Sequence, residues 1–137
     1  MKRFSVTTIF WALIVVFAII IGNMMLFPSF LPESLRMYMI YIMFVSWAVS
    51  FVLGLVLIVS TVKQKVEGAL KKFLLLAGAS AVGFPLFAVL HNLVSALLGV
   101  EEPFFFILAA IVCPLGFLVG VIGTITLFYK KKKLDKT

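Results

Sequence analysis

Residues 104–129 read FFFILAAIVCPLGFLVGVIGTITLFY, a predominantly apolar run without Asp, Glu, Lys or Arg. Because an α-helix rises ~1.5 Å per residue and the hydrocarbon core of a bilayer is ~30 Å thick, about 20 apolar residues cross it. This run is longer than that minimum. It therefore predicts a transmembrane helix.

Three further runs of the same character precede it, at residues 5–27, 38–62 and 73–98. The connections at 28–37, 63–72 and 99–103 are too short to hold a soluble domain. The sequence therefore predicts an all-α integral membrane protein, a four-helix transmembrane bundle that forms one membrane domain over residues 1–137. The first run exceeds the apolar region of a signal peptide, so we expect it to be retained as a span.

The composition supports lipid as the solvent of this chain. Of its 137 residues, 64% are hydrophobic and 12% are charged, whereas a soluble domain usually has about 25% charged residues. The mean hydropathy is +1.27. The net charge of +7 does not indicate nucleic-acid binding, because no run outside the spans is long enough for a soluble module with a basic face. A single cysteine, Cys113, excludes a disulfide within one chain.

The basic residues predict the orientation. All but one of the 12 Lys and Arg residues lie at the two chain ends or in the connection 63–72, and Arg36 is the exception. Short cytoplasmic segments carry the excess of Lys and Arg, so we expect both termini in the cytoplasm, in a prokaryotic plasma membrane. The tail 130–137 is then expected to face anionic lipid headgroups. Its leading basic residues are Lys130, Lys131, Lys132 and Lys133.

Small residues recur at helical spacing in three spans and predict close helix packing. They are Ser46, Ser50 and Gly54 in the second span, Ala77, Ala81 and Ala88 in the third, and Gly116, Gly120 and Gly123 in the fourth. These faces suit either a compact bundle within one chain or self-association between copies. Pro85 and Pro114 lie near the middles of the third and fourth spans, where each removes a helical hydrogen bond and is a possible kink.

The polar residues of the outer halves form the candidate site. An ionisable residue inside a span is costly and is read first as functional, which singles out His91. We expect it to share a polar pocket with Asn92, Ser95 and Asn23. Three carboxylates are expected to form an outer acidic rim: Glu33, Glu101 and Glu102. The pocket could bind a small polar ligand or a proton, or its side chains could simply join helices.

Metal and catalytic chemistry find little support in the sequence. Met39 and Met43 stand one helical turn apart and thioethers suit Cu(I), but methionine is also an ordinary apolar side chain. Catalysis needs a nucleophile beside a base, or two carboxylates, and the predicted spans contain no Asp, Glu, Lys or Arg. We therefore expect no cofactor, no metal and no enzymatic activity.

Three functions remain open. The first is an accessory or stabilising subunit that packs with itself, as a homo-oligomer, or with a larger membrane complex. The second is a small oligomeric transporter or channel that uses the His91 and Asn92 site. The third is a binder or sensor of an external lipid or peptide. The sequence favours the first, because a bundle packed on small residues leaves little room for a pore.

Overall fold

The computed structural model describes residues 5–25 and 31–136. The predicted span residues 26–27, the loop residues 28–30 and the last residue of the tail lie outside the described residues. Within the described part of the chain, all regular structure is helical. The elements are α1 (Val6–Met25), α2 (Glu33–Lys63), α3 (Gly68–Leu98), α4 (Pro103–Ile107), the π-helix η1 (Leu108–Val112) and α5 (Cys113–Leu134).

The chain is an all-helical integral membrane protein with four spans. Three are α1, α2 and α3, and the fourth is the continuous segment Pro103–Leu134, which joins α4, η1 and α5. The prediction of four transmembrane helices is confirmed. The fourth helix continues to Leu134, through lysines that were expected in a tail. Lysine is a good helix former, and its charge is favourable at a helix C-terminus.

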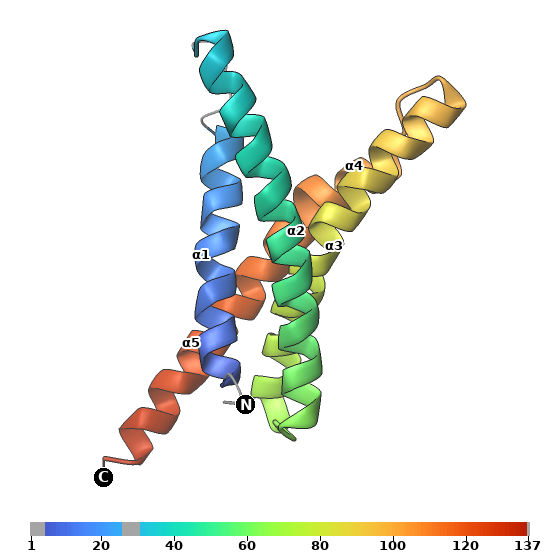
Figure 1. Ribbon diagram of the computed structural model, residues 1–137. Coiled ribbons are helices and arrows are strands. Elements are labelled where there is room, and N and C mark those ends of the chain that lie inside the picture. The colour runs from blue at the N-terminus through green and yellow to red at the C-terminus, as the bar shows by residue number, and fades with distance from the viewer. Residues whose placement is uncertain (1–4, 26–30, 137) are drawn as a thin grey trace.

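The two ends of the bundle differ in charge. At one end lie the start of α1, the α2–α3 turn and the end of α5 (Figure 1), and we call this the basic end because Lys63, Lys71 and Lys130 are there. The opposite end carries Glu33 at the start of α2 and Glu102 before α4, and we call it the acidic end. Both described chain ends therefore lie at the basic end.

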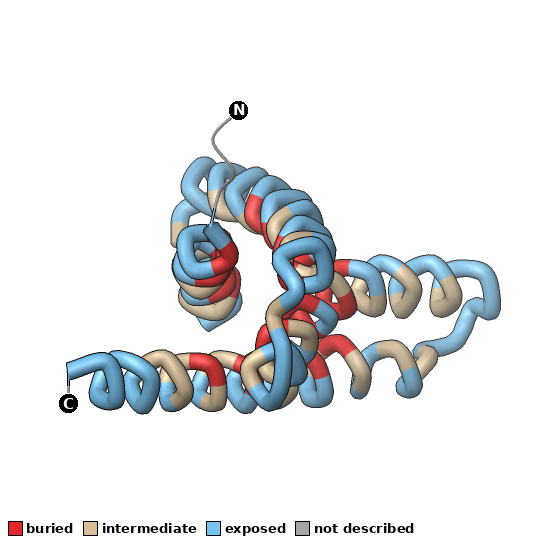
Figure 2. Tube along the Cα trace, turned by 90° about the horizontal axis from the view of Figure 1, so that it is seen from below, coloured by how far each residue is buried: buried red, intermediate tan, exposed pale blue. Residues whose placement is uncertain are grey.

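The four spans form two hairpins that diverge. The first hairpin is α1 with α2, and the second is α3 with the fourth span. Toward the acidic end the second hairpin leans away from the first, and toward the basic end α5 runs diagonally past α1 (Figure 1). Helix α3 is central, since it packs closely against both α2 and α5. Buried residues concentrate where the helices cross, while the end of α3 and the last turns of α5 are exposed (Figure 2).

Glycine allows the closest of these crossings. A Cβ atom on Gly54 of α2 would lie 2.9 Å from the carbonyl oxygen of Gly78 on α3. A Cβ on Gly120 of α5 would lie 2.7 Å from the amide nitrogen of Ala77 on α3. Backbone atoms cannot move aside as a side chain can. The helices therefore approach each other this closely only because these positions lack side chains.

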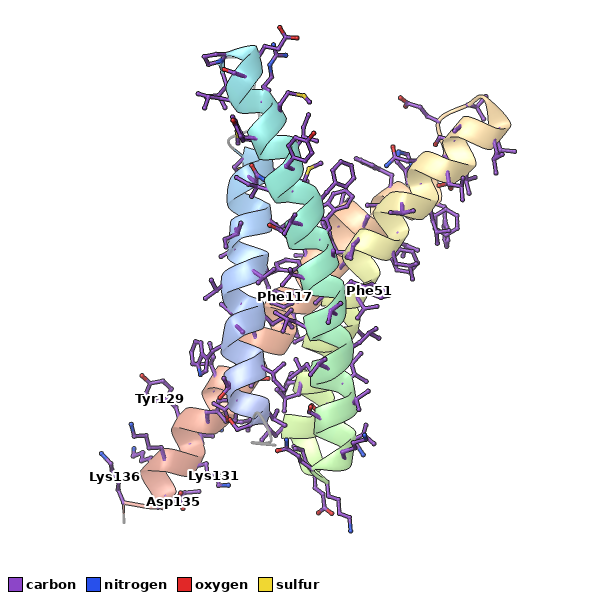
Figure 3. The ribbon with its side chains drawn as sticks, viewed as in Figure 1. Phe51, Phe117, Tyr129, Lys131, Asp135 and Lys136 are labelled. Carbon is purple, nitrogen blue, oxygen red and sulfur yellow. The ribbon has the colours of Figure 1, made fainter. Side chains whose placement is uncertain are left out.

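Aromatic rings connect α1 to α5. Phe17 stacks on Phe117 with ring centroids 3.9 Å apart, and Phe10 meets Phe128 edge-on at 6.0 Å. Figure 3 shows Phe117 on the part of α5 that passes behind the first hairpin. Rings of this size keep two backbones apart, so this contact is looser than the glycine crossings of α3.

Pro85 lies inside α3 without interrupting it. Proline has no N–H, so the carbonyl of Ala81, four residues earlier, loses its usual donor. The hydroxyl of Ser50 on α2 donates a hydrogen bond to this carbonyl at 3.1 Å, and Ser50 is fully buried. A neighbouring serine thus satisfies the group that the proline leaves free. The hydroxyl of Ser46, in contrast, bonds to Ile42 of its own helix at 2.6 Å.

Candidate functional site

His91 and Ser95, two of the predicted pocket residues, form hydrogen bonds that stabilise the turn between α3 and α4. His91 Nδ1 lies 2.7 Å from the carbonyl oxygen of Glu102, and Ser95 Oγ accepts a hydrogen bond from the Glu102 amide at 3.0 Å. The left-handed Gly99 ends α3 and reverses the chain, which brings Glu102 back beside the last turns of α3. We call His91, Ser95 and Glu102 the turn staple.

The staple selects the tautomer of the neutral histidine ring. A carbonyl oxygen can only accept, so Nδ1 of His91 donates to Glu102 and Nε2 is the acceptor in the neutral ring. The ring lies 5.4 Å from the ring of Phe106 between centroids. One ring nitrogen of the sole histidine is therefore occupied by a main-chain contact.

The carboxylate of Glu102 is also occupied. It accepts hydrogen bonds from the amides of Phe104 at 2.6 Å and Phe105 at 2.9 Å, which caps the start of α4. Glu33 lies at the start of α2, on the other arm of the diverging hairpins (Figure 1). The structure therefore does not bring Glu33 together with Glu101 and Glu102, and an acidic rim over one pocket is not formed. The divergence of the hairpins is the physical reason.

Because Glu102 caps the start of α4, the substitution Glu102→Ala should make the protein less stable. We expect the free energy of unfolding to fall by about 1 kcal/mol, since the amides of Phe104 and Phe105 would lose their acceptor. Thermal unfolding in detergent, followed by circular dichroism, measures this loss. Glu101→Ala is the matched control, because Glu101 is exposed and should change the melting temperature little. Equal effects of both substitutions would contradict a capping role.

Asn23 does not join the other pocket residues. Its amide donates to the carbonyl of Met39 at 3.1 Å, within the contact between α1 and α2. Asn92 is exposed and donates to Ala88 of its own helix at 2.8 Å. The predicted pocket of four residues is thus divided between the α1–α2 contact, the turn staple and a cleft.

The cleft lies in the acidic half of the protein, where the two hairpins diverge. It has a volume of about 190 Å³ and residues from all four spans line it. An adjoining cavity of about 290 Å³ shares Met24, Phe84 and Ala110 with it. The cleft is lined by Met24, Trp47, Phe84, Ala88, His91, Asn92, Phe106, Ala109 and Ala110.

Trp47, one of the residues that line this cleft, carries an unpaired donor. Its Nε1 is buried and has no hydrogen-bond partner among the described residues. The indole packs edge-on against Phe84 at 5.6 Å between centroids. A buried N–H without an acceptor costs about 1–3 kcal/mol. Trp47 was not among the predicted site residues, because a tryptophan in a span is usually only apolar surface.

The π-helix contributes an acceptor. In η1 the amide of Cys113 bonds to the carbonyl of Leu108, five residues earlier. The next donor in this register would be residue 114, but Pro114 has no N–H, so the carbonyl of Ala109 loses its donor in the ladder. The fourth span therefore changes its helical register next to Pro114, and π-helical turns of this kind occur frequently at functional sites.

The small-residue faces lie mainly inside the protein. A Cβ on Gly116 would meet Ser80 and one on Gly123 would meet the ring of Phe73, both on α3. The face that could have served self-association through the fourth span is therefore covered by α3 of the same chain.

The basic residues of α5 stand apart from the cleft. Tyr129, Lys131, Asp135 and Lys136 lie on or just after the last turns of α5, beyond the other helices (Figure 3). Among the described residues, no group of three or more His, Cys, Asp and Glu side chains could hold a metal ion.

Comparison with protein families, with curated proteins and with solved structures finds no match to this chain. The arguments for function therefore come from its own residues and their arrangement.

Proposed function

We propose that the protein is a non-enzymatic accessory or stabilising subunit, which packs against another transmembrane helix through one face of α1. The observation that carries this proposal is a small-residue face of α1 that none of the described helices covers. Ala18 is exposed, and a Cβ added to Gly22 would meet no atom within 4 Å. Residues four apart share one face of a helix, so Ala18 and Gly22 form one small-residue pair.

The other glycines of the spans give this observation its weight. Gly54, Gly116, Gly120 and Gly123 are each in close contact with α3, which explains their small size. Gly22 has no such contact within the chain, although glycine inside a helix costs about 1 kcal/mol relative to alanine. In membranes, helices associate where small residues let backbones approach closely. A second helix packed against this face would give Gly22 the same role as Gly54, Gly116, Gly120 and Gly123, which each let a neighbouring helix approach closely.

The packing of the basic half supports this function over transport. Phe10, Leu13, Leu57 and Leu74 are fully buried there, on α1, α2 and α3. A path for a solute through one chain would have to pass these side chains. The cleft near His91 lies in the opposite half and is small. These features support a packing role for the chain, and any pore would need several copies.

The orientation is part of the proposal. We place the basic end on the cytoplasmic side of a plasma membrane, because Lys63, Lys71 and the lysines of α5 gather there. Each basic residue near an anionic leaflet contributes about 1 kcal/mol of attraction. The helical lysines Lys130–Lys133 then lie beside anionic headgroups and anchor the last span.

Ala18→Leu tests the proposed face. We expect it to release the protein from its assembly, because a leucine side chain would hold the partner helix away from Gly22. Native mass spectrometry of protein extracted in a mild detergent reports the loss as a shift to the single chain. Ala12→Leu is the matched control, since Ala12 is also exposed on α1 but lies about 120° around the helix.

Two results would count against this face. One is an assembly that survives Ala18→Leu unchanged. The other is an equal loss with Ala12→Leu, which would indicate a general effect of bulk on α1. Circular dichroism of both variants should match the unchanged protein, because both positions are exposed.

A further inference from the structure

The cleft of the acidic half combines apolar walls with a few polar groups. Its apolar walls include Phe84 of α3 and Phe106 of α4. A cavity of about 150 Å³ lined by apolar side chains can hold benzene. The cleft, with about 190 Å³, and its neighbour, with about 290 Å³, are therefore large enough for a segment of an alkyl chain but not for a whole drug-sized ligand.

Three residues that line the cleft, Trp47, Asn92 and Ala109, carry donors or acceptors that the described chain leaves unused. Trp47 Nε1 is a buried donor without a partner among the described residues. The carbonyl of Ala109 has lost its helical donor to Pro114. The amide of Asn92 uses one N–H within its own helix, so its oxygen and second N–H are available to a ligand. A few such groups in an apolar pocket are typical of ligand sites.

The charge of the lining restricts the ligand further. None of the residues that line the cleft is Asp, Glu, Lys or Arg. His91 already donates through Nδ1 to a main-chain carbonyl. The nearest carboxylate is that of Glu102, whose Oε2 lies 3.9 Å from His91 Nδ1. An anionic headgroup would therefore enter this site beside a negative group and without a lysine or arginine in the lining, at a large desolvation cost. A hydroxyl group both donates and accepts, so an uncharged hydroxylated headgroup matches the groups that the cleft offers.

We propose that this cleft binds an uncharged single-chain amphiphile of the monoacylglycerol class. Its glycerol hydroxyls and ester carbonyl bind at Trp47, Asn92 and the carbonyl of Ala109. Its acyl chain lies along Phe84 and Phe106 and leaves the cleft between the diverging hairpins into the bilayer. This site is independent of the Ala18 and Gly22 face, which lies elsewhere on α1.

The test uses the full chain with Trp11→Phe, which leaves Trp47 as the only tryptophan. The protein is placed in phosphatidylcholine nanodiscs and titrated with monooleoylglycerol or with oleate at a pH where oleate is ionised. We expect the indole N–H resonance of Trp47 to move saturably with monooleoylglycerol. We expect oleate, which has the same chain and a charged head, to bind at least tenfold more weakly.

Three variants localise the binding. Ala88→Leu fills the cleft and should reduce the affinity for monooleoylglycerol more than tenfold. Asn92→Leu should reduce it about tenfold, and this position is exposed, so the fold should tolerate the change. Ala96→Leu is the control on the same helix, because Ala96 is exposed and does not line the cleft. The proposal is overturned if oleate binds as tightly as monooleoylglycerol, or if both cleft variants bind like Ala96→Leu.

Discussion

Gly120→Ala is expected to lower the free energy of unfolding by about 3 kcal/mol. The new Cβ would lie 2.7 Å from the amide nitrogen of Ala77, 2.9 Å from the Ala77 Cβ and 2.9 Å from the carbonyl oxygen of Phe73. Two of these three atoms belong to the backbone of α3, which cannot move without moving the whole helix. The expected result is therefore a separation of α5 from α3.

Gly22→Ala is the matched control for this prediction. It adds the same methyl group to a span, but no atom lies within 4 Å of the new Cβ. The single chain should be unchanged or slightly more stable, because alanine favours the helix by about 1 kcal/mol over glycine. Unfolding of both variants by SDS in mixed micelles, followed by circular dichroism, measures the difference. Equal stability of Gly120→Ala and Gly22→Ala would contradict the glycine crossing of α3 and α5.

Ser50→Ala is expected to destabilise the protein by about 1.5 kcal/mol. The Ser50 hydroxyl supplies the donor that Pro85 withholds from the carbonyl of Ala81, and its loss leaves a buried acceptor unpaired. Interhelical hydrogen bonds in membranes usually contribute less, about 0.6 kcal/mol, because alternative partners exist. Here the carbonyl has no helical donor to return to, so we expect a value above that average.

Two comparisons make this prediction specific. Ser46→Ala should cost only a few tenths of a kcal/mol, since that hydroxyl bonds to a carbonyl that keeps its place in its own helix. In a Pro85→Ala background, the restored N–H can bond to Ala81, so Ser50→Ala should cost about 1 kcal/mol less than in the unchanged protein. The same SDS unfolding assay measures each of these costs. A cost for Ser50→Ala that is identical in both backgrounds would refute the link between Ser50 and Pro85.

The spans could be predicted from the sequence because apolar length is a one-dimensional property. The run at 73–98 falls within α3, and the run at 104–129 falls within the fourth span. The boundaries were less accurate where charged residues continue a helix, as at the end of α5. Charge marks the edge of the hydrocarbon core, but it does not end a helix.

The site could be predicted only in part. His91 and Ser95 were expected to share a ligand pocket, but they bond to Glu102, which a turn of few residues brings back over α3. Asn23 was expected beside them, but the divergence of the hairpins leaves it on the α1–α2 contact. Spacing along one helix predicts which residues share a face. It cannot predict how two hairpins lean, since packing across the whole interface sets that angle.

The contributions of Pro114 and Trp47 to the cavities could have been predicted from the sequence. Pro114 was expected only as a kink, yet a proline inside a span also leaves a carbonyl without a donor, and η1 lies directly before it. Trp47 lies well inside the second span, away from the membrane interfaces where tryptophan is enriched. A polar N–H at such depth indicates a partner. Both residues line the cavities between the diverging hairpins.

The central claim is that this chain works as a packing subunit through the open face of α1. Native mass spectrometry of the unchanged protein, extracted gently from its own membrane, tests it most directly, because it reports copy number and companions together. We predict recovery with a second transmembrane chain, either another copy or a larger membrane protein, and loss of that chain on Ala18→Leu. Recovery of a bare single chain from the native membrane would contradict the claim.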